Sequence, residues 1–362
     1  MRSPRVVRVA IAAACALGVG VGTAAGTGAV VAAAQSGSDP FARVDASMRD
    51  RVRADGLDGG VLLVVRDGAV IHEESFADVT PSTVMPIASA SKWLTSATLM
   101  TLVDEGRLSL DDHVADHLPG FGGRKKAVKV RHLLSHTSGL EFDGCIADPG
   151  TTTEACTARI ADGADPSTRP GTQFAYSSVG YEVAARLVEV LTGQSFEEAF
   201  EARIARPLGM TATRFDAYGG QRVRHPQPAA SAVSSVDDYA KFVAMMASGG
   251  SANGRRIRAA ESVSEIERDQ VKGIDTRADG AVQTTGIPTY GLGVWRDVVG
   301  RDDEIKVVSG SGAYGFYPWI DRRRGSYGIV GVADLYHGAD HAVPASQRQA
   351  RASWRAAAQW VP

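Results

Sequence analysis

The strand-forming segments of this chain gather near its two ends, and this placement limits the folds that it can adopt. Residues 59–75 contain two β-rich runs around Asp67-Gly68, a dipeptide typical of a tight hairpin turn. Strand patterns return at 303–309, 313–321 and 326–334, and a helical pattern follows at 342–360. We expect one antiparallel sheet that takes two strands from the first end and three from the second. The sequence therefore predicts an α+β fold.

The long middle of the chain is mostly helical in pattern. Ser195 and Glu198 form a capping-box signature before one helix, and Ser235 and Asp238 form a similar one before another. We therefore expect an antiparallel sheet flanked by N- and C-terminal helices, the first of them at 41–53, with a large helical insertion. The expected boundaries are 35–362 for a single domain, about 41–80 and 285–362 for its sheet part, and about 88–284 for its helical part.

The composition is that of a globular chain without a general affinity for nucleic acid. Its 362 residues are 44% hydrophobic and 22% charged, which is enough to build a sizeable core. The formal net charge is −2, whereas proteins that bind nucleic acid usually carry a basic excess. We therefore expect no nucleic-acid partner.

The first 34 residues have the pattern of an export signal. Arg2, Arg5 and Arg8 precede an uncharged run rich in Ala, Gly and Val, and the run ends in an Ala-x-Ala-like cleavage site at 32–34. We expect a cleaved signal peptide at 1–34 and a secreted, extracytoplasmic protein. Retention of the run as a membrane anchor is the first alternative, and contact with a membrane is expected only in that case. Lipidation at Cys15 is the second alternative, which its place inside the apolar run disfavours.

Cys145 and Cys156 are the cysteines that remain after such a cleavage. They lie eleven positions apart in a polar stretch that contains Pro, Gly and Thr. In an oxidising exterior these two most simply pair with each other, and a metal site would need further thiols. The sequence therefore predicts a disulfide between them.

A Ser-x-x-Lys motif, formed by Ser89 and Lys92, opens an apolar helical run. Residues three apart share a helix face, so the lysine amine can reach the serine hydroxyl. A serine hydroxyl becomes a good nucleophile only when a base removes its proton, and lysine is such a base only if burial lowers its pKa towards 7. The competing interpretation is a surface serine and lysine on a capped helix.

Six segments of the chain together resemble one known family. They are 87–112, 131–140, 174–189, 206–215, 234–246 and 290–295. Their order is similar to that in the serine β-lactamase, penicillin-binding-protein and esterase family, above all its class C β-lactamase and D-alanyl-D-alanine carboxypeptidase branch. The resemblance covers about 58–334 and implies a β-lactamase/transpeptidase-like fold.

The resemblance also implies roles for individual residues. It makes Ser89 the nucleophile, Lys92 its proton acceptor and Tyr176 a group that shares proton transfer and protonates the leaving group. Ser178 stands where the family's Tyr-x-Asn motif has asparagine, and a hydroxyl there can still hydrogen-bond the lysine or the substrate. The competing interpretation of Tyr176 is a half-buried aromatic side chain before a helix.

The family's third motif, Lys or His-x-Gly, is best matched by Gly310, Ser311 and Gly312, which are expected to line the substrate site. No cation occupies the first position, so the usual contact to a substrate carboxylate is missing and a penicillin or D-Ala-D-Ala substrate is less secure. Gly312 still permits close approach of the substrate. The backbone N–H groups of Ser89 and Ala313 are expected to form the oxyanion hole.

Two cofactor interpretations are weaker. Residues 310–315 also satisfy Gly-x-Gly-x-x-Gly, with Asp334 downstream, but a strand-like run follows where a dinucleotide site needs a helix. The histidine pairs four positions apart are His113 and His117, His132 and His136, and His337 and His341. None has the Glu of a His-Glu-x-x-His motif. We therefore expect no cofactor and no metal.

The function that these observations predict is an exported serine hydrolase that forms and hydrolyses an acyl-enzyme on an ester or amide, as an esterase, D-Ala peptidase or β-lactamase. Its partner is a small-molecule or peptide acyl substrate, and no oligomeric state is predicted. The alternative is a non-catalytic penicillin-binding or acyl-sensing protein on the same fold, suggested by Ser178 and Gly310.

Overall fold

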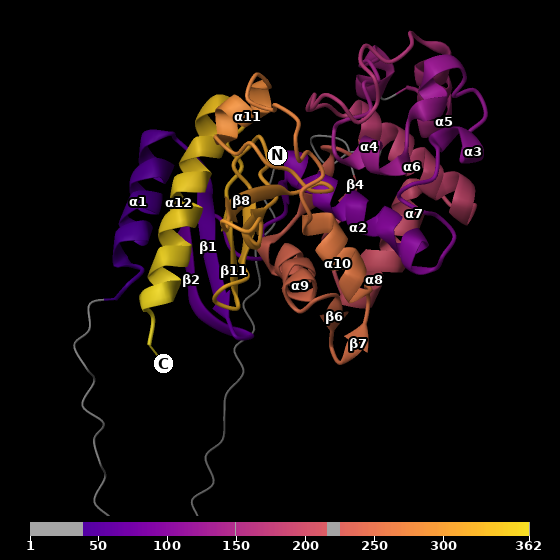
Figure 1. The fold of residues 1–362 in the computed structure, drawn as a ribbon. Coiled ribbons are helices and arrows are strands. Elements are labelled where there is room, and N and C mark those ends of the chain that lie inside the picture. The colour runs from indigo at the N-terminus through magenta and orange to yellow at the C-terminus, as the bar shows by residue number, and fades with distance from the viewer. Residues whose placement is uncertain (1–38, 149, 216–224, 362) are drawn as a thin grey trace, which may run out of the picture. The chain divides into compact units, whose positions relative to one another are not determined.

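The computed structural model describes residues 39–148, 150–215 and 225–361, and its central element is a six-stranded antiparallel sheet (Figure 1). The strands are β1 (Gly59–Arg66), β2 (Ala69–Ala77), β8 (Trp295–Val299), β9 (Ile305–Ser309), β10 (Tyr317–Asp321) and β11 (Ser326–Gly331). Their order is β2-β1-β11-β10-β9-β8. The pairing of β1 with β11, from Val61 opposite Gly331 to Arg66 opposite Ser326, joins the two ends of the chain. The predicted fold class is confirmed.

Two details of the sheet differ from the prediction. Strand β8 was not expected, because its Trp-Arg-Asp-Val-Val run is short and lacks a clean alternation of hydrophobic and polar residues. It pairs with β9 through irregular register shifts. The strand predicted at 313–321 begins only at Tyr317. The preceding residues form a turn in which Gly315 has a φ of +92° and its N–H donates to the carbonyl of Gly312.

Both faces of the sheet are buried. In β1, Leu62 and Val64 face a hydrophobic cluster with α1 (Ala42–Ala54) and α12 (Ala339–Gln359), while Val61, Leu63 and Val65 face the cluster on the other side. Helices α1 and α12 lie side by side on the outer face in Figure 1. Helix α9 (Val236–Ala247) packs against β10 and β11 on the inner face.

The helical insertion is built around α2 (Ser91–Asp104) and α6 (Val179–Thr192), which pack against each other. Its other helices are α3 (Val114–His117), α4 (Val130–Leu134), α5 (Thr153–Asp162), α7 (Phe196–Phe200), α8 (Arg206–Leu208), α10 (Ala260–Glu267) and α11 (Gly280–Thr285). Short strands complete it: β3 (Met85–Pro86), β4 (Arg214–Phe215), β5 (Ala232–Ser234), β6 (Ser251–Ala252) and β7 (Arg255–Arg256). Single helical turns occupy Ala88–Ala90, Gly123–Ala127, Gly144–Ala147 and Glu201–Ala205.

One of the two predicted capping boxes is present. Ser195 and Glu198 bond each other reciprocally at the start of α7. Ser235 accepts from the N–H of Asp238 at the start of α9, but the Asp238 carboxylate does not return to it. That carboxylate instead accepts from the N–H of Ala212, 2.6 Å away, and therefore joins α9 to the segment before β4.

The predicted disulfide joins Cys145 and Cys156. It connects the helical turn at Gly144–Ala147 to α5, and both cysteines are buried in the hydrophobic cluster of the insertion. The predicted signal peptide at 1–34 lies outside the described residues. In the described part of the chain, no helix is long and apolar enough to cross a membrane.

Replacing both cysteines by serine should lower the free energy of unfolding by about 3 kcal/mol, because the bond closes a short loop and restricts the unfolded chain. Urea unfolding of the oxidised protein and of the Cys145→Ser/Cys156→Ser variant measures the difference. Identical midpoints and slopes would show that the disulfide adds no stability.

Candidate active site

Ser89 and Lys92 lie in contact at the start of α2. Ser89 is half-buried in the helical turn Ala88–Ala90, and Lys92 is buried one turn further along. The Lys92 amine Nζ lies 3.1 Å from the Ser89 Oγ and also donates to the carbonyl of Ala229 at 3.1 Å. The spacing of the Ser-x-x-Lys motif is therefore realised as a direct hydrogen bond.

Burial lowers the pKa of Lys92 from 10.5 to about 7. The side chain is 2% exposed, and within the described residues no acidic side chain forms an ion pair with it. Its Nζ instead lies 4.6 Å from the ring centroid of Tyr176 and 5.5 Å from that of Tyr181. An amine in these surroundings is neutral in a large fraction of molecules at pH 7.

Tyr176 lies on the other side of this pair. Burial raises the pKa of its phenol to about 12, a hydrogen bond with Ser89 opposes the rise, and the charge of Asp279 adds to it. Asp279 also fixes the backbone, since its Oδ2 accepts from the N–H of Tyr176 at 2.8 Å. The ring stacks on Trp295. The phenol therefore keeps its proton at neutral pH and can donate it.

Ser178 is not bonded to the lysine. It is half-buried and is the N-cap residue of α6, two positions after Tyr176. The hydrogen-bond partners of the Lys92 amine are the Ser89 Oγ and the Ala229 carbonyl, not Ser178. Of the two contacts expected for Ser178, the one to the lysine is therefore not formed.

The turn that carries Ser89 is strained and held in place. Ala88 has a φ of +45°, a left-handed conformation that costs energy for a residue with a side chain. Its carbonyl accepts a hydrogen bond of 2.6 Å from the hydroxyl of Ser91, which itself accepts from the N–H of Ala232. No sequence motif distinguishes Ser91 from other serines on the helix, so its role was not predicted.

Gly312, in the loop after β9, lies against Ile87, the residue that precedes this turn. A Cβ atom at Gly312 would lie 2.2 Å from the carbonyl oxygen of Ile87, so only glycine fits here. The contact places the peptide between Gly312 and Ala313 beside the turn that carries Ser89. Ala313 is half-buried, as is Ser89, whereas Ser311 is buried.

Gly310 leaves little room for a longer side chain. A Cβ atom there would lie 3.1 Å from the indole of Trp93 and 3.5 Å from Pro318. Position 310 offers no cationic side chain, and the Trp93 ring lies beside it.

The pair His132 and His136 does not lie on one helix face. Helix α4 ends at Leu134, so His136 lies beyond it with a φ of +58°. Its Nδ1 accepts from the N–H of Ser177, and its ring packs against Tyr176 with centroids 4.3 Å apart. Burial, and then the charge of Lys92, hold the pKa of His136 well below its usual value. His136 therefore packs beside Tyr176 as a neutral side chain, which is the kind of structural role that the resemblance of segment 131–140 implies.

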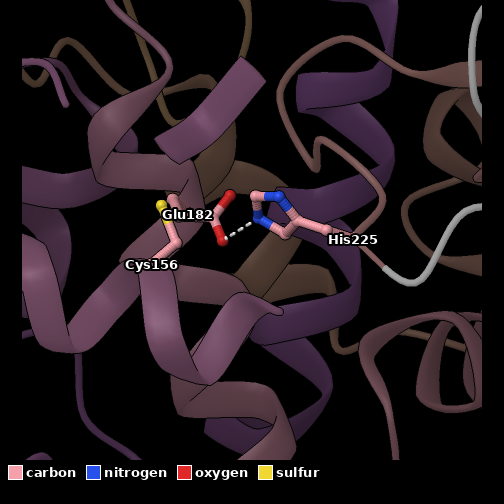
Figure 2. A group of neighbouring side chains, drawn as sticks. All are labelled: Cys156, Glu182 and His225. Carbon is pink, nitrogen blue, oxygen red and sulfur yellow. Dashed lines mark hydrogen bonds and ion pairs between the residues drawn. The ribbon is translucent and has the colours of Figure 1, made fainter. Parts of the chain in front are cut away.

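Two other clusters have the side-chain types of metal sites. In the first, Cys156 lies beside Glu182 and His225 (Figure 2), but its sulfur belongs to the disulfide, and Glu182 bonds His225. In the second, which comprises Asp334, His337 and His341, the Nδ1 of His337 lies 2.9 Å from the Oδ1 of Asp334, and the Nε2 of His341 lies 2.8 Å from Asp55. Each of these imidazoles already has a carboxylate partner.

The Gly-x-Gly-x-x-Gly segment is not followed by a helix. After Gly315 the chain enters β10 at Tyr317. The helix N-terminus that holds a pyrophosphate in dinucleotide-binding proteins is therefore replaced by a strand.

Comparison with known proteins identifies the family. The sequence profile of the Beta-lactamase family matches residues 44–352. Penicillin-binding protein 4 of Amycolatopsis lactamdurans is 39% identical over 166 residues, which cover 42% of this chain and 43% of that protein. Protein flp of Staphylococcus aureus is 28% identical over 193 residues, 49% of this chain and 39% of that protein. The chain spans less than half the length of these curated relatives.

Solved structures share the whole fold. A protein from Bacteroides dorei DSM 17855, provisionally described as a β-lactamase, is 30% identical with a TM-score of 0.80, covering 88% of this chain and 99% of that one. A family VIII carboxylesterase is 20% identical with a TM-score of 0.70, covering 88% of this chain and 97% of that one. The match of the sequence profile to residues 44–352 and the solved structure that is 30% identical show that the chain belongs to the Beta-lactamase family.

Proposed function

We propose that this protein is a serine hydrolase that carries an acyl group on Ser89. The observation that carries the proposal is the 3.1 Å contact between Ser89 Oγ and an amine whose pKa burial lowers to about 7. The shift corresponds to about 5 kcal/mol of differential destabilisation of the ammonium form. It raises the neutral fraction at pH 7 from about one in three thousand to about one half.

The proposed reaction gives each side chain one proton-transfer role. Lys92 takes the proton of Ser89 while the Oγ bonds to the substrate carbonyl carbon. The N–H groups of Ser89 and Ala313 stabilise the resulting oxyanion. Tyr176 then donates its proton to the leaving group as the bond to that group breaks, and recovers a proton from Lys92. Water finally hydrolyses the acyl-enzyme and restores the Ser89 hydroxyl.

The proposed substrate is an ester or amide that does not depend on a carboxylate contact at position 310. Gly310 supplies no cation, and Trp93 fills the adjoining space. This arrangement favours an esterase, or a peptidase whose substrate lacks such a carboxylate, over a β-lactamase, because β-lactams and D-Ala-D-Ala peptides carry a carboxylate that is usually paired with a cation. A carboxylesterase is among the proteins of the same fold. We further propose that residues 1–34 direct the protein to the cell exterior.

A second candidate is a penicillin-binding or acyl-sensing protein that is acylated but does not deacylate. The departures at Ser178 and Gly310, and the similarity to Penicillin-binding protein 4, favour it. Intact-protein mass spectrometry after mixing with a penicillin separates the candidates. A sensor retains a stable penicilloyl adduct, whereas a hydrolase of penicillins loses it and an esterase that excludes penicillins never forms it.

The purified protein should hydrolyse a nitrophenyl ester faster than a chromogenic cephalosporin or a D-Ala-D-Ala peptide. Ser89→Ala should lower the rate by at least 1,000-fold, because the nucleophile is lost. Steady-state kinetics on the three substrates measures this, with Ser264→Ala, an exposed serine on α10, as control. No turnover of any substrate, or equal activity of Ser89→Ala, would remove the support for a serine hydrolase.

Acylation should depend on the neutral form of Lys92. Because burial lowers the pKa of this lysine to about 7, the rate should rise about tenfold per pH unit below pH 7 and level off above it. Lys92→Arg, which stays charged, should be inactive at every pH. Labelling of Ser89 by a fluorophosphonate between pH 5 and 9 measures the profile. A rate that still rises steeply at pH 9 would show that the lysine has its ordinary pKa.

A further inference from the structure

Glu182 of α6 and His225 form a buried pair that the proposed reaction does not use. The Nε2 of His225 lies 2.6 Å from the Oε1 of Glu182, and both side chains are 0% exposed (Figure 2). His225 belongs to the segment 225–231, which leads into β5. The pair therefore fastens this segment to the helix that begins just after Tyr176 and Ser178.

The hydrogen bonds of His225 define its protonation. Its Nδ1 faces the carbonyl oxygen of Asp148 at 3.2 Å, and a carbonyl oxygen can only accept, so the Nδ1 carries a proton. One further proton lies between the Nε2 of His225 and the Oε1 of Glu182. Burial opposes the charged imidazole, but the hydrogen bond and charge of Glu182 outweigh it and raise the pKa of His225. Burial also raises the pKa of Glu182, and the charge of Glu189 adds to this effect.

The same segment forms a wall of the proposed active site. The carbonyl of Pro228 accepts a 2.6 Å hydrogen bond from the hydroxyl of Thr95, one turn along α2 from Ser91. The carbonyl of the next residue, Ala229, accepts from Lys92 Nζ. Ala232 then donates to Ser91 Oγ and accepts from the N–H of Ile87. Four hydrogen bonds thus join this segment and the first residue of β5 to α2 and to Ile87, just before the turn that carries Ser89.

The Ala229 carbonyl determines where the lysine lone pair points. A neutral amine has two N–H donors and one lone pair. When one N–H is held by the Ala229 carbonyl, rotation of the amine is restricted and the lone pair can remain directed at the proton of Ser89. The segment also covers the amine, and burial is the cause of its lowered pKa.

We propose that Glu182 and His225 are positioning residues for Lys92: their bond holds the segment 225–231 so that the Ala229 carbonyl orients the amine and water is kept from it. The inference rests on the proposed function in naming Lys92 as the base. The Oε2 of Glu182 has no hydrogen-bond partner in the described part of the chain. A buried pair with an unpartnered oxygen adds little net stability, which agrees with a role in placement.

The test uses three single variants of the full-length protein. Glu182→Ala breaks the pair, whereas Glu182→Gln keeps it, because the amide can donate to the Nε2 of a neutral His225. The matched control is Asp45→Ala, which breaks another histidine–carboxylate pair, that of Asp45 and His72, with atoms 2.8 Å apart. That pair joins α1 to β2 on the outer face of the sheet.

Two readouts are measured on each variant. The first is the rate of Ser89 labelling by a fluorophosphonate at pH 7. The second is the pKa of Lys92 from an NMR titration of ¹³Cε-lysine-labelled protein, with the Lys92 signal assigned by its loss in Lys92→Arg. Urea unfolding of each variant confirms that the measurements are made on folded protein.

Glu182→Ala should slow labelling at least tenfold and raise the Lys92 pKa by at least one unit, because water reaches the loosened amine. Glu182→Gln and Asp45→Ala should stay within threefold of the unchanged protein and leave the pKa in place, even where their urea midpoints fall. A Glu182→Leu/His225→Leu variant, which leaves no unpaired buried charge, should behave as Glu182→Ala and replaces it if that variant does not fold.

Unchanged labelling and pKa in folded Glu182→Ala, or equal changes in Asp45→Ala, would overturn the proposal and leave the pair a structural one. If the unchanged protein is not labelled at Ser89, the proposed hydrolase function fails. The NMR titration then decides the positioning role alone, with a pKa shift in Glu182→Ala and none in Asp45→Ala supporting it.

Discussion

The burial of one amine is the constraint on which the site depends. Lys92 is surrounded by the rings of Tyr176 and Tyr181, by Ser89 and by a backbone carbonyl, without an acidic partner in the described residues. An ammonium in such surroundings loses its hydration without gaining a counter-ion, so the neutral form is favoured. The fold must supply enough stability elsewhere to hold this unfavourable group, and the sheet packed on both faces does so.

The tyrosine and the lysine differ in protonation for the same physical reason. Desolvation disfavours any charged form, so it lowers the pKa of a base and raises that of an acid. Desolvation of Lys92 and Tyr176 therefore produces an amine that can accept a proton beside a phenol that can donate one. One cause, burial, therefore accounts for both shifts. A change that admits water would raise the pKa of Lys92 and lower the pKa of Tyr176.

The sequence predicted the parts of this arrangement that depend on local pattern. The hairpin at Asp67-Gly68, the strands that return near the C-terminus and the capping box at Ser195 follow from turn chemistry and periodicity. The sequence did not predict the contacts that tertiary packing creates between distant residues. Trp93 beside Gly310, Asp279 under the Tyr176 backbone and His225 against Glu182 join segments far apart in the chain.

The pairing of β1 with β11 has a consequence for how the protein is made. Strand β1 has its hydrogen-bonding partner in β11, with Val61 opposite Gly331, so the central sheet cannot close until the chain through β11 has been synthesised. Contacts of such high sequence separation form slowly, because a long loop must be ordered first. Until β11 has been made and has paired with β1, the sheet therefore lacks its central contact and the chain lacks a finished core.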